Sequence, residues 1–255
     1  MTASVHRPEE DGDAVEVGAF AFLGDPHVVD LLAASGVDWV CLDCQHGRFD
    51  DAKVLATLDM KQESHARLVV RVRALDAGLI GRALDSGAEG IIVPMIESAA
   101  DARKAVSASF YPPRGQRSFG PIRSIVGDRS DTDLANDRVM CAVMVETRAA
   151  VDAIEQIAST PGVGMLFVGP YDLALALGTT VDDLLNDDSR HSPLRRIADA
   201  AGDSALQLGA FAGTPERATR LIELGFTFIA VTGDTSALAY GTRTMVESIH
   251  QLVRL

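Results

Sequence analysis

Short apolar runs rich in β-branched residues alternate along the chain with segments whose apolar residues recur at helical spacing. These runs are apolar throughout, which is typical of parallel strands that are buried on both faces. Eight of them are predicted as strands, at residues 17–22, 37–43, 66–72, 90–95, 140–146, 164–169, 206–212 and 226–232. Eight strand–helix units favour one closed (β/α)8 barrel, a TIM barrel, and an open doubly wound sheet is the alternative.

Helical patterns fill the gaps between the predicted strands. They cover residues 26–35, 50–63, 76–87, 98–108, 147–159, 215–224 and 236–254, and a short helix is expected to start near Pro170. Met245, Ile249 and Leu252 share one face of the last helix. That spacing predicts either a core face or a contact with a partner subunit.

Two stretches interrupt this alternation. Residues 109–131 are rich in Pro, Gly and Arg and are predicted as a long loop. Arg114, Arg117 and Arg123 in this loop could meet a carboxylate or a neighbouring subunit, and a solvated loop is an equal alternative. Residues 179–205 are acidic and polar, and we expect a surface excursion there.

Composition narrows the range of partners. The chain has 255 residues, 47% of them hydrophobic, and a net charge of −13 without any run of Lys or Arg, so we expect no nucleic-acid partner. No apolar stretch approaches the ~20 residues that a membrane span needs. Residues 1–14 are polar and acidic and are predicted to be a disordered lead to a single domain at 15–255. A cytoplasmic location is the default expectation.

Cys41 and Cys44 form a CxxC pair that invites a redox or zinc interpretation. Their spacing within a strand places the two side chains on opposite faces, with Cα atoms ~10 Å apart, which is too far for a disulfide. The chain has no second CxxC to complete a zinc site. We therefore expect small structural residues at both positions.

Glu146 and Asp172 stand just past two consecutive predicted strands. Active-site residues of TIM barrels lie at the carboxyl ends of the strands, so these carboxylates are expected at one edge of the sheet. Carboxylate oxygens suit hard cations, and two of them leave positions open for water and substrate. We predict a divalent metal site at Glu146 and Asp172, with Mg²⁺ or Mn²⁺ as the expected ion and Co²⁺ as a further possibility.

Polar residues at two other strand ends complete this prediction. Arg71 could bind the carbonyl oxygen or a carboxylate of a 2-oxo acid and hold its negative charge. His46 is a candidate base, acting directly or through water, and Asp43 could orient it. The GPYD segment at 169–172 offers backbone N–H groups at a helix start, which suit a carboxylate. Each residue alone also has an ordinary structural interpretation as a salt-bridged or turn residue.

The lysines provide a separate argument about the mechanism. The chain has three, Lys53, Lys61 and Lys104, and all lie in predicted helices. A Schiff-base aldolase needs a lysine that faces the substrate. Stabilisation of a carbanion is therefore expected to come from a metal or from cationic groups.

Several segments together resemble the HpcH/HpaI aldolase family, the metal-dependent class II 2-oxo-acid aldolases of the pyruvate/phosphoenolpyruvate barrel group. The resemblance extends from about Val17 to the C-terminus. The segments that carry it are DWVCLDCQHG, LVVRV, IIVPMIESAADARKAV, YPPRGQRSFG, VETRAAVDAIEQIASTPGV and FVGPYDLALALG. The resemblance implies a TIM barrel that reversibly cleaves a 4-hydroxy-2-oxo acid to pyruvate and an aldehyde through a metal-stabilised enolate. It also implies a hexamer, a trimer of dimers, whose last helix is exchanged between subunits.

The resemblance also implies roles for individual residues. His46 matches the catalytic base, Asp43 its acidic neighbour and Arg71 the pyruvyl-binding arginine. Glu146 and Asp172 match the metal ligands. The segment that holds the pyruvyl carboxylate is matched by Gly169, Pro170 and Tyr171.

Four positions differ from the family pattern. Gln45 stands for the usual Glu, Met144 for Gln, Ala174 for Ser and Phe20 for Trp. Gln45 and Met144 are still expected beside the substrate, where they bear on its choice. Two alternatives stay open: a citryl- or malyl-CoA-type lyase on the same scaffold, and a non-catalytic barrel that binds a ligand.

Overall fold

Eight parallel strands close into a barrel in the computed structural model, which describes residues 14–60, 66–120 and 131–253. Each strand pairs with the next along the chain, and the eighth pairs with the first. The strands are β1 (Glu16–Ala21), β2 (Trp39–Asp43), β3 (Arg67–Arg71), β4 (Gly90–Val93), β5 (Met140–Val145), β6 (Met165–Val168), β7 (Gln207–Phe211) and β8 (Phe228–Gly233). This closed order confirms the predicted TIM barrel and excludes the open sheet.

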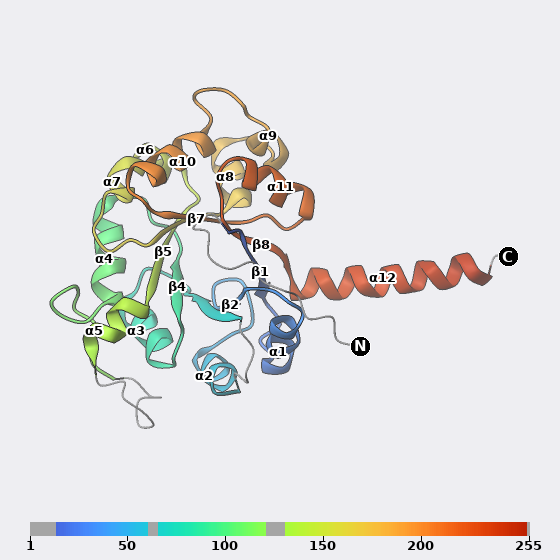
Figure 1. Ribbon diagram of the computed structural model, residues 1–255, viewed down its shortest axis with the longest axis horizontal. Coiled ribbons are helices and arrows are strands. Elements are labelled where there is room, and N and C mark those ends of the chain that lie inside the picture. Colours follow the sequence, from blue (N-terminus) through green and yellow to red (C-terminus); the bar gives the residue numbers. More distant parts are fainter. Residues whose placement is uncertain (1–13, 61–65, 121–130, 254–255) are drawn as a thin grey trace.

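Helices surround the barrel, except the last one along the chain, which extends away from it (Figure 1). They are α1 (Pro26–Ala34), α2 (Asp51–Met60), α3 (Ala77–Asp85), α4 (Ala99–Ser109), α5 (Thr132–Arg138), α6 (Arg148–Asp152), α7 (Ile154–Ala158), α8 (Pro170–Leu177), α9 (Val181–Leu185), α10 (Pro193–Asp203), α11 (Pro215–Glu223) and α12 (Asp234–Val253). The single helix predicted at 147–159 is two helices that meet at Ala153. Residues 1–13 of the predicted lead and Arg123 lie outside the described residues.

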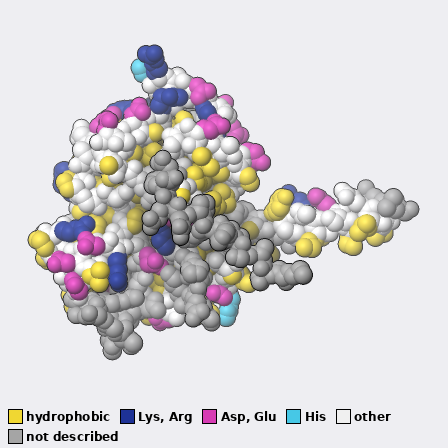
Figure 2. Space-filling model, in the orientation of Figure 1, with side chains coloured by type: hydrophobic (Ala, Val, Ile, Leu, Met, Phe, Trp, Pro, Cys, Tyr) yellow, Lys and Arg dark blue, Asp and Glu magenta, His cyan; other side chains and the backbone are white. Residues whose placement is uncertain are grey.

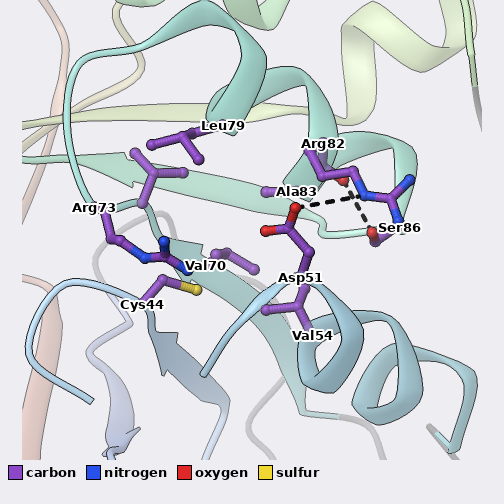
Figure 3. Close-up of a pocket in the computed structure, with 10 residues that line it drawn as sticks. Cys44, Asp51, Val54, Val70, Arg73, Leu79, Arg82, Ala83 and Ser86 are labelled. Carbon is purple, nitrogen blue, oxygen red and sulfur yellow. Dashed lines mark hydrogen bonds and ion pairs between the residues drawn. The ribbon is translucent and has the colours of Figure 1, made fainter. Parts of the chain in front are cut away.

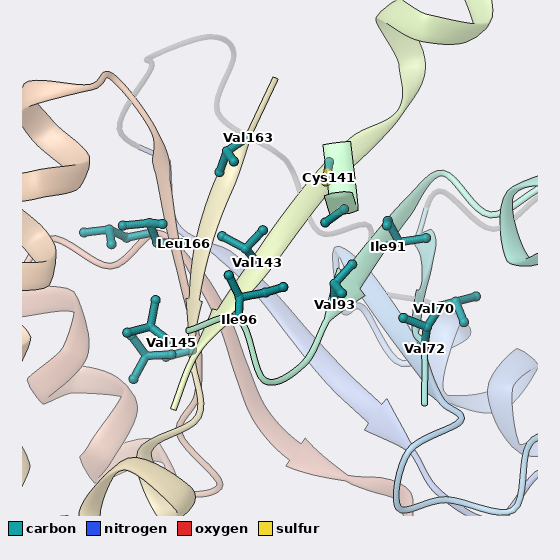
Figure 4. Close-up of a cluster of buried hydrophobic side chains, with 14 of the residues drawn as sticks. Val70, Val72, Ile91, Val93, Ile96, Cys141, Val143, Val145, Val163 and Leu166 are labelled. Atoms are coloured by element: carbon teal, nitrogen blue, oxygen red, sulfur yellow. The ribbon is translucent and has the colours of Figure 1, made fainter. Parts of the chain in front are cut away.

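The apolar side chains form two layers, one on each face of the sheet. Alternate residues of each strand point to opposite faces, so a strand buried on both faces contributes to both layers. The outer layer lies between the sheet and the helices, and Figure 4 shows part of it, including Val70, Val143 and Leu166. The inner layer fills the barrel with bulky residues such as Trp39, Phe167 and Phe228. This packing explains why the strands are apolar throughout.

The amino-terminal end of the barrel is closed by aromatic and polar side chains. Trp39 and Phe228, at the starts of β2 and β8, stack with ring centroids 3.9 Å apart. The Glu16 carboxylate forms an ion pair with Arg67 and accepts a hydrogen bond from Gln207. Substrate access is therefore expected at the carboxyl end.

The polar segment 179–205 is more than a surface excursion, so that prediction was wrong. It contains α9 and α10, and α10 buries Leu194, Ile197 and Ala201 against its neighbours. These residues recur at helical spacing, but the surrounding charges masked the pattern.

Helix α12 projects away from the barrel (Figure 1). The side chains of Met245, Ile249 and Leu252 are 57–75% exposed, so the expectation of a core face is wrong for this chain alone. Figure 2 shows hydrophobic side chains along this helix. Such a large exposed apolar face is typical of an interaction surface. Among the described residues, no helix is long and apolar enough to cross a membrane.

Candidate active site

Asp43 and Arg71 form a buried ion pair at the carboxyl end of the barrel. They are register partners at the ends of β2 and β3, and both side chains point inward. Arg71 donates from Nε to Oδ1 of Asp43 (2.9 Å) and from Nη2 to Oδ2 (2.6 Å). Burial alone lowers the pKa of Arg71, but the hydrogen bonds to Asp43 outweigh this effect and raise it above its ordinary value. The guanidinium is thus charged and held in one orientation, 5.2 Å from the ring centroid of Phe20.

His46 lies on the loop that follows β2, and its side chain lines a cavity. Oδ1 of Asp43 accepts hydrogen bonds from the backbone N–H groups of Gln45 (2.9 Å) and His46 (3.3 Å). At Gly47 an added Cβ would lie 2.3 Å from the Asp43 carbonyl oxygen, so only glycine fits. Asp43 therefore orients His46 through the main chain of the loop while its other contacts hold Arg71.

Glu146 follows β5 and is 2% exposed. Its Oε1 accepts a hydrogen bond from the Met95 N–H (2.7 Å). Burial raises the pKa of Glu146, Asp172 adds to this rise, and the Met95 N–H, Arg71 and His46 oppose it. Each of these two carboxylates destabilises the negative charge of the other, and a bound cation would relieve that repulsion.

Met95 reaches Glu146 from a strained backbone conformation. Its φ is +56°, in the left-handed region, which costs roughly 1–3 kcal/mol for a residue other than glycine. The strand predicted at 90–95 ends at Val93, because Pro94 has no N–H to continue the ladder. The turn aims the Met95 N–H at the carboxylate. Sequence periodicity gave no signal for this role.

Asp172 lies in the first turn of α8, directly after the β6 exit. Pro170 occupies the start of this helix and Gly169 its N-cap, where no side chain caps the backbone. An added Cβ on Gly169 would lie 3.1 Å from both Oε2 of Glu146 and Cε of Met144. Because Gly169 has no side chain, the Glu146 carboxylate can lie against the backbone at this point. The free N–H groups in the first turn of α8 favour an anion.

These residues surround a cavity of about 200 Å³. Its lining is Phe20, Phe22, His46, Arg71, Met144, Phe167, Gly169, Pro170, Tyr171, Asp172 and Phe211. Pockets for drug-sized ligands hold roughly 300–1,000 Å³, so this cavity suits a smaller substrate. Of the predicted site residues, Asp43 and Glu146 lie behind this lining, and Gln45 contributes its backbone to Asp43 rather than its side chain to the cavity.

The donor set fits a hard divalent cation. Glu146 is fixed through Oε1, and its second oxygen faces Gly169 near the Asp172 side of the cavity. Among the described residues no group of three or more His, Cys, Asp or Glu could hold a metal, so Glu146 and Asp172 would be the protein's ligands. Such a pair leaves the remaining positions of a Mg²⁺-like ion to water and substrate.

A small crevice and the Cys41–Cys44 pair lie outside the cavity lining. A crevice between α2 and α3, which includes Cys44, Arg73 and Arg82, measures about 20 Å³, room for about one water (Figure 3). Cys41 faces the barrel interior and Cys44 the outer layer, as predicted from their spacing. Burial raises the pKa of Cys41, and that of Cys44 to about 12, so neither forms a thiolate readily.

The model of the HpcH/HpaI aldolase/citrate lyase family matches residues 16–240. This chain belongs to that family. It is similar to the hydroxypyruvate/pyruvate aldolase of Roseovarius nubinhibens, with 34% identity over 89% of each chain. It is also similar to the 2-dehydro-3,6-dideoxy-6-sulfogluconate aldolase of Pseudomonas putida, with 32% identity over 87% of this chain and 88% of the other.

A solved structure agrees with the fold. An HpcH/HpaI aldolase/citrate lyase family protein from Burkholderia cenocepacia superposes with a TM-score of 0.84, at 33% identity, over 94% of this chain and 96% of the other. The protein is thus an aldolase, a carbon–carbon lyase, of the HpcH/HpaI family.

The HpcH/HpaI cavity has a wall that the sequence did not reveal. Phe22, Phe167 and Phe211 line it alongside the expected residues. Phe20 packs against Phe211 with ring centroids 5.2 Å apart. These aromatic residues could have been predicted from the alternation of inward- and outward-facing residues along each strand, since each lies at or next to a strand's carboxyl end.

Substitution of Gly169 tests how closely the chain approaches Glu146. We expect Gly169→Ala to lower turnover by at least about tenfold, because the added methyl must displace the Glu146 carboxylate or Met144. Gly81→Ala is the matched control, because its Cβ meets nothing within 4 Å on α3. It should keep full turnover and raise the free energy of unfolding by up to about 1 kcal/mol. Steady-state kinetics and urea unfolding of both variants measure these effects. Full turnover in Gly169→Ala would contradict the close packing of Gly169 against Glu146.

Proposed function

We propose that this HpcH/HpaI family member is a divalent-metal-dependent aldolase that reversibly cleaves a 4-hydroxy-2-oxo acid to pyruvate and an aldehyde. The observation that carries the proposal is the convergence of Arg71, His46, Glu146 and Asp172 on one small cavity or directly behind its wall. The names of the relatives support pyruvate as one product.

A cation held by Glu146 and Asp172, such as Mg²⁺, Mn²⁺ or Co²⁺, would act as a Lewis acid on the 2-oxo acid. Arg71 donates hydrogen bonds to the C2 oxygen and stabilises the negative charge that develops there. Its pairing with Asp43 keeps the guanidinium oriented before substrate arrives, so little reorganisation is needed during the reaction.

His46 accepts the proton of the C4 hydroxyl, directly or through one water. The C3–C4 bond then breaks, its electron pair forms the enolate of pyruvate, and the aldehyde leaves. His46, which now carries that proton, delivers it to C3, directly or through the same water, and this completes pyruvate. The backbone N–H groups at the start of α8, after Gly169, Pro170 and Tyr171, hold the carboxylate of the 2-oxo acid.

The cavity disfavours a CoA ester as substrate. It has room for a small acid, and Arg71 is the guanidinium among its lining residues. A CoA thioester needs a long groove and cations for its phosphates. The citryl- or malyl-CoA-type alternative therefore fits these residues less well. The non-catalytic alternative does not account for His46, Arg71 and Asp172 lining one cavity.

Cleavage of 4-hydroxy-2-oxo acids in a coupled assay for pyruvate tests the proposal. We expect pyruvate release with Mn²⁺ or Mg²⁺, loss of release after treatment with EDTA, and recovery when the metal is restored. Unchanged turnover after complete removal of metal would contradict the metal-dependent mechanism. Circular dichroism before and after EDTA shows that the fold is retained.

The projecting α12 supports an oligomer, and we propose a hexamer, a trimer of dimers, in which this helix is exchanged between subunits. Its apolar face is exposed in the single chain. We expect the double substitution Met245→Asp with Ile249→Asp to reduce the assembly to smaller species in light scattering. Gln251→Asp, on the opposite face of α12, adds a charge as a control and should keep six chains together. A monomeric wild type would contradict the proposal.

A further inference from the structure

Tyr171 occupies a position beside the reacting groups. It lies in the first turn of α8, directly before Asp172, and lines the cavity. Its side chain is 47% exposed, and its ring packs against Phe211 at the end of β7, with centroids 6.1 Å apart. The ring thus forms part of the cavity's outer wall.

An arginine from another helix holds this ring. Arg217 of α11 donates from Nη1 to the Tyr171 hydroxyl (2.7 Å), and its Cζ lies 5.5 Å from the ring centroid. Nε of Arg217 donates to Oδ1 of Asp182 on α9 (2.8 Å). The guanidinium therefore joins α8, α9 and α11 at the mouth of the barrel, and two of its donors are already engaged.

The loop after β7 is shaped to fit the tyrosine. Gly213 has φ +77°, a conformation that favours glycine. An added Cβ there would lie 2.9 Å from the Tyr171 hydroxyl and 3.3 Å from Cε1 of Phe211. The ring position is thus fixed by a hydrogen bond on one side and by close backbone approach on the other.

The start of α8 faces the 2-oxo acid through its backbone N–H groups, whereas the Tyr171 ring packs on Phe211 at the end of β7. In a ring of eight strands, β7 lies across from β3, which carries Arg71. The Tyr171 ring and Phe211 therefore lie on the side of the cavity that is remote from Arg71. The wall on this side is aromatic, and the charge of Arg217 is compensated by Asp182.

We propose that Tyr171, braced by Arg217, forms the wall against which the carbon chain of the aldehyde packs, and that it selects short, uncharged aldehydes. This inference rests on the aldolase function proposed above. Arg217 is a positioning residue that acts through the tyrosine ring.

The test compares aldol addition of pyruvate to propanal, to 3-phenylpropanal and to succinic semialdehyde. We expect the wild type to prefer propanal over each of the other two, by about tenfold or more in kcat/KM. Tyr171→Ala should lower the preference for propanal over 3-phenylpropanal by about tenfold, because it removes the wall. A wild type that prefers succinic semialdehyde would overturn the proposed selection for uncharged aldehydes.

Arg217→Met and Tyr171→Phe test the brace while keeping the ring. Each should lower the same preference, and the double variant should lower it no further, because both changes break one hydrogen bond. Arg220→Met is the control on the same helix, since Arg220 bonds to Leu185, Asp188 and Glu223, and it should leave the preference unchanged.

Proton exchange at C3 of pyruvate, measured in every variant, separates this inference from the aldolase function. We expect exchange in Arg217→Met and Arg220→Met to stay within about twofold of wild type, because neither arginine lines the cavity. Exchange in the wild type, together with an unchanged aldehyde preference in Arg217→Met and Tyr171→Phe, would overturn this inference and leave the aldolase function standing. Absence of exchange in the wild type with metal would overturn the proposed function and the inference with it.

Discussion

Glu146→Gln should abolish aldolase turnover and weaken Mn²⁺ binding by more than about 100-fold. Changes to outer groups around a metal already cost 10–100-fold in affinity or activity, and Glu146 is proposed as a direct ligand. The amide oxygen of Gln can still accept the hydrogen bond from the Met95 N–H, so the turn at the end of β4 should persist. Calorimetric titration with Mn²⁺ measures the affinity, and the coupled pyruvate assay measures turnover.

The matched control for this change is Glu155→Gln. Glu155 is an exposed carboxylate on α7 that pairs with Arg196, far from the cavity lining. It should keep wild-type turnover and metal affinity. Tight Mn²⁺ binding in Glu146→Gln would show that the metal is held elsewhere.

Arg71→Met should lower turnover by about 10²–10³-fold and destabilise the fold by about 3–5 kcal/mol. The activity falls because the C2 oxygen loses its charged donor. The stability falls because Asp43, which is 0% exposed, is left buried without its partner. Denaturant unfolding and steady-state kinetics measure the two effects separately.

A second change at Asp43 separates stability from catalysis. Asp43→Asn in the Arg71→Met background removes the stranded charge while its oxygen still accepts the backbone N–H groups of Gln45 and His46. We expect the double variant to recover most of the lost stability and none of the turnover. Recovery of turnover would mean that Arg71 supports only the fold. Arg71→Met with near-wild-type stability would contradict the proposed ion-pair energetics.

Elements could be predicted from the sequence where the hydrophobic pattern of a segment matches its burial in the fold. All eight strands were predicted because each is buried on both faces and therefore apolar throughout. Asp43, Arg71 and Glu146 were predicted as site residues because barrel chemistry is confined to the carboxyl ends of strands, and each lies at or directly after such an end. Helix α10 was missed because its apolar positions are separated by charged residues, which reduced the apparent signal.

The features that the sequence could not show depend on contacts between distant segments. Oε1 of Glu146 bonds to Met95, 51 residues earlier, through a left-handed turn that no propensity predicts. The contact between Tyr171 and Arg217 spans 46 residues and depends on Gly213 leaving room for the hydroxyl. The pairing of Asp43 with Arg71 follows from strand register, which is set by the closed barrel rather than by either strand.

Exchange of the C3 protons of pyruvate in D₂O, followed by NMR with and without Mg²⁺ or Mn²⁺, reports enolate formation without any knowledge of the aldehyde. We expect metal-dependent exchange in the wild type and its loss in His46→Ala and Glu146→Gln. A folded, metal-bound wild type that exchanges no protons would contradict the claim that this site forms the enolate of pyruvate. Equal exchange in wild type and His46→Ala would contradict the assignment of His46 as the base.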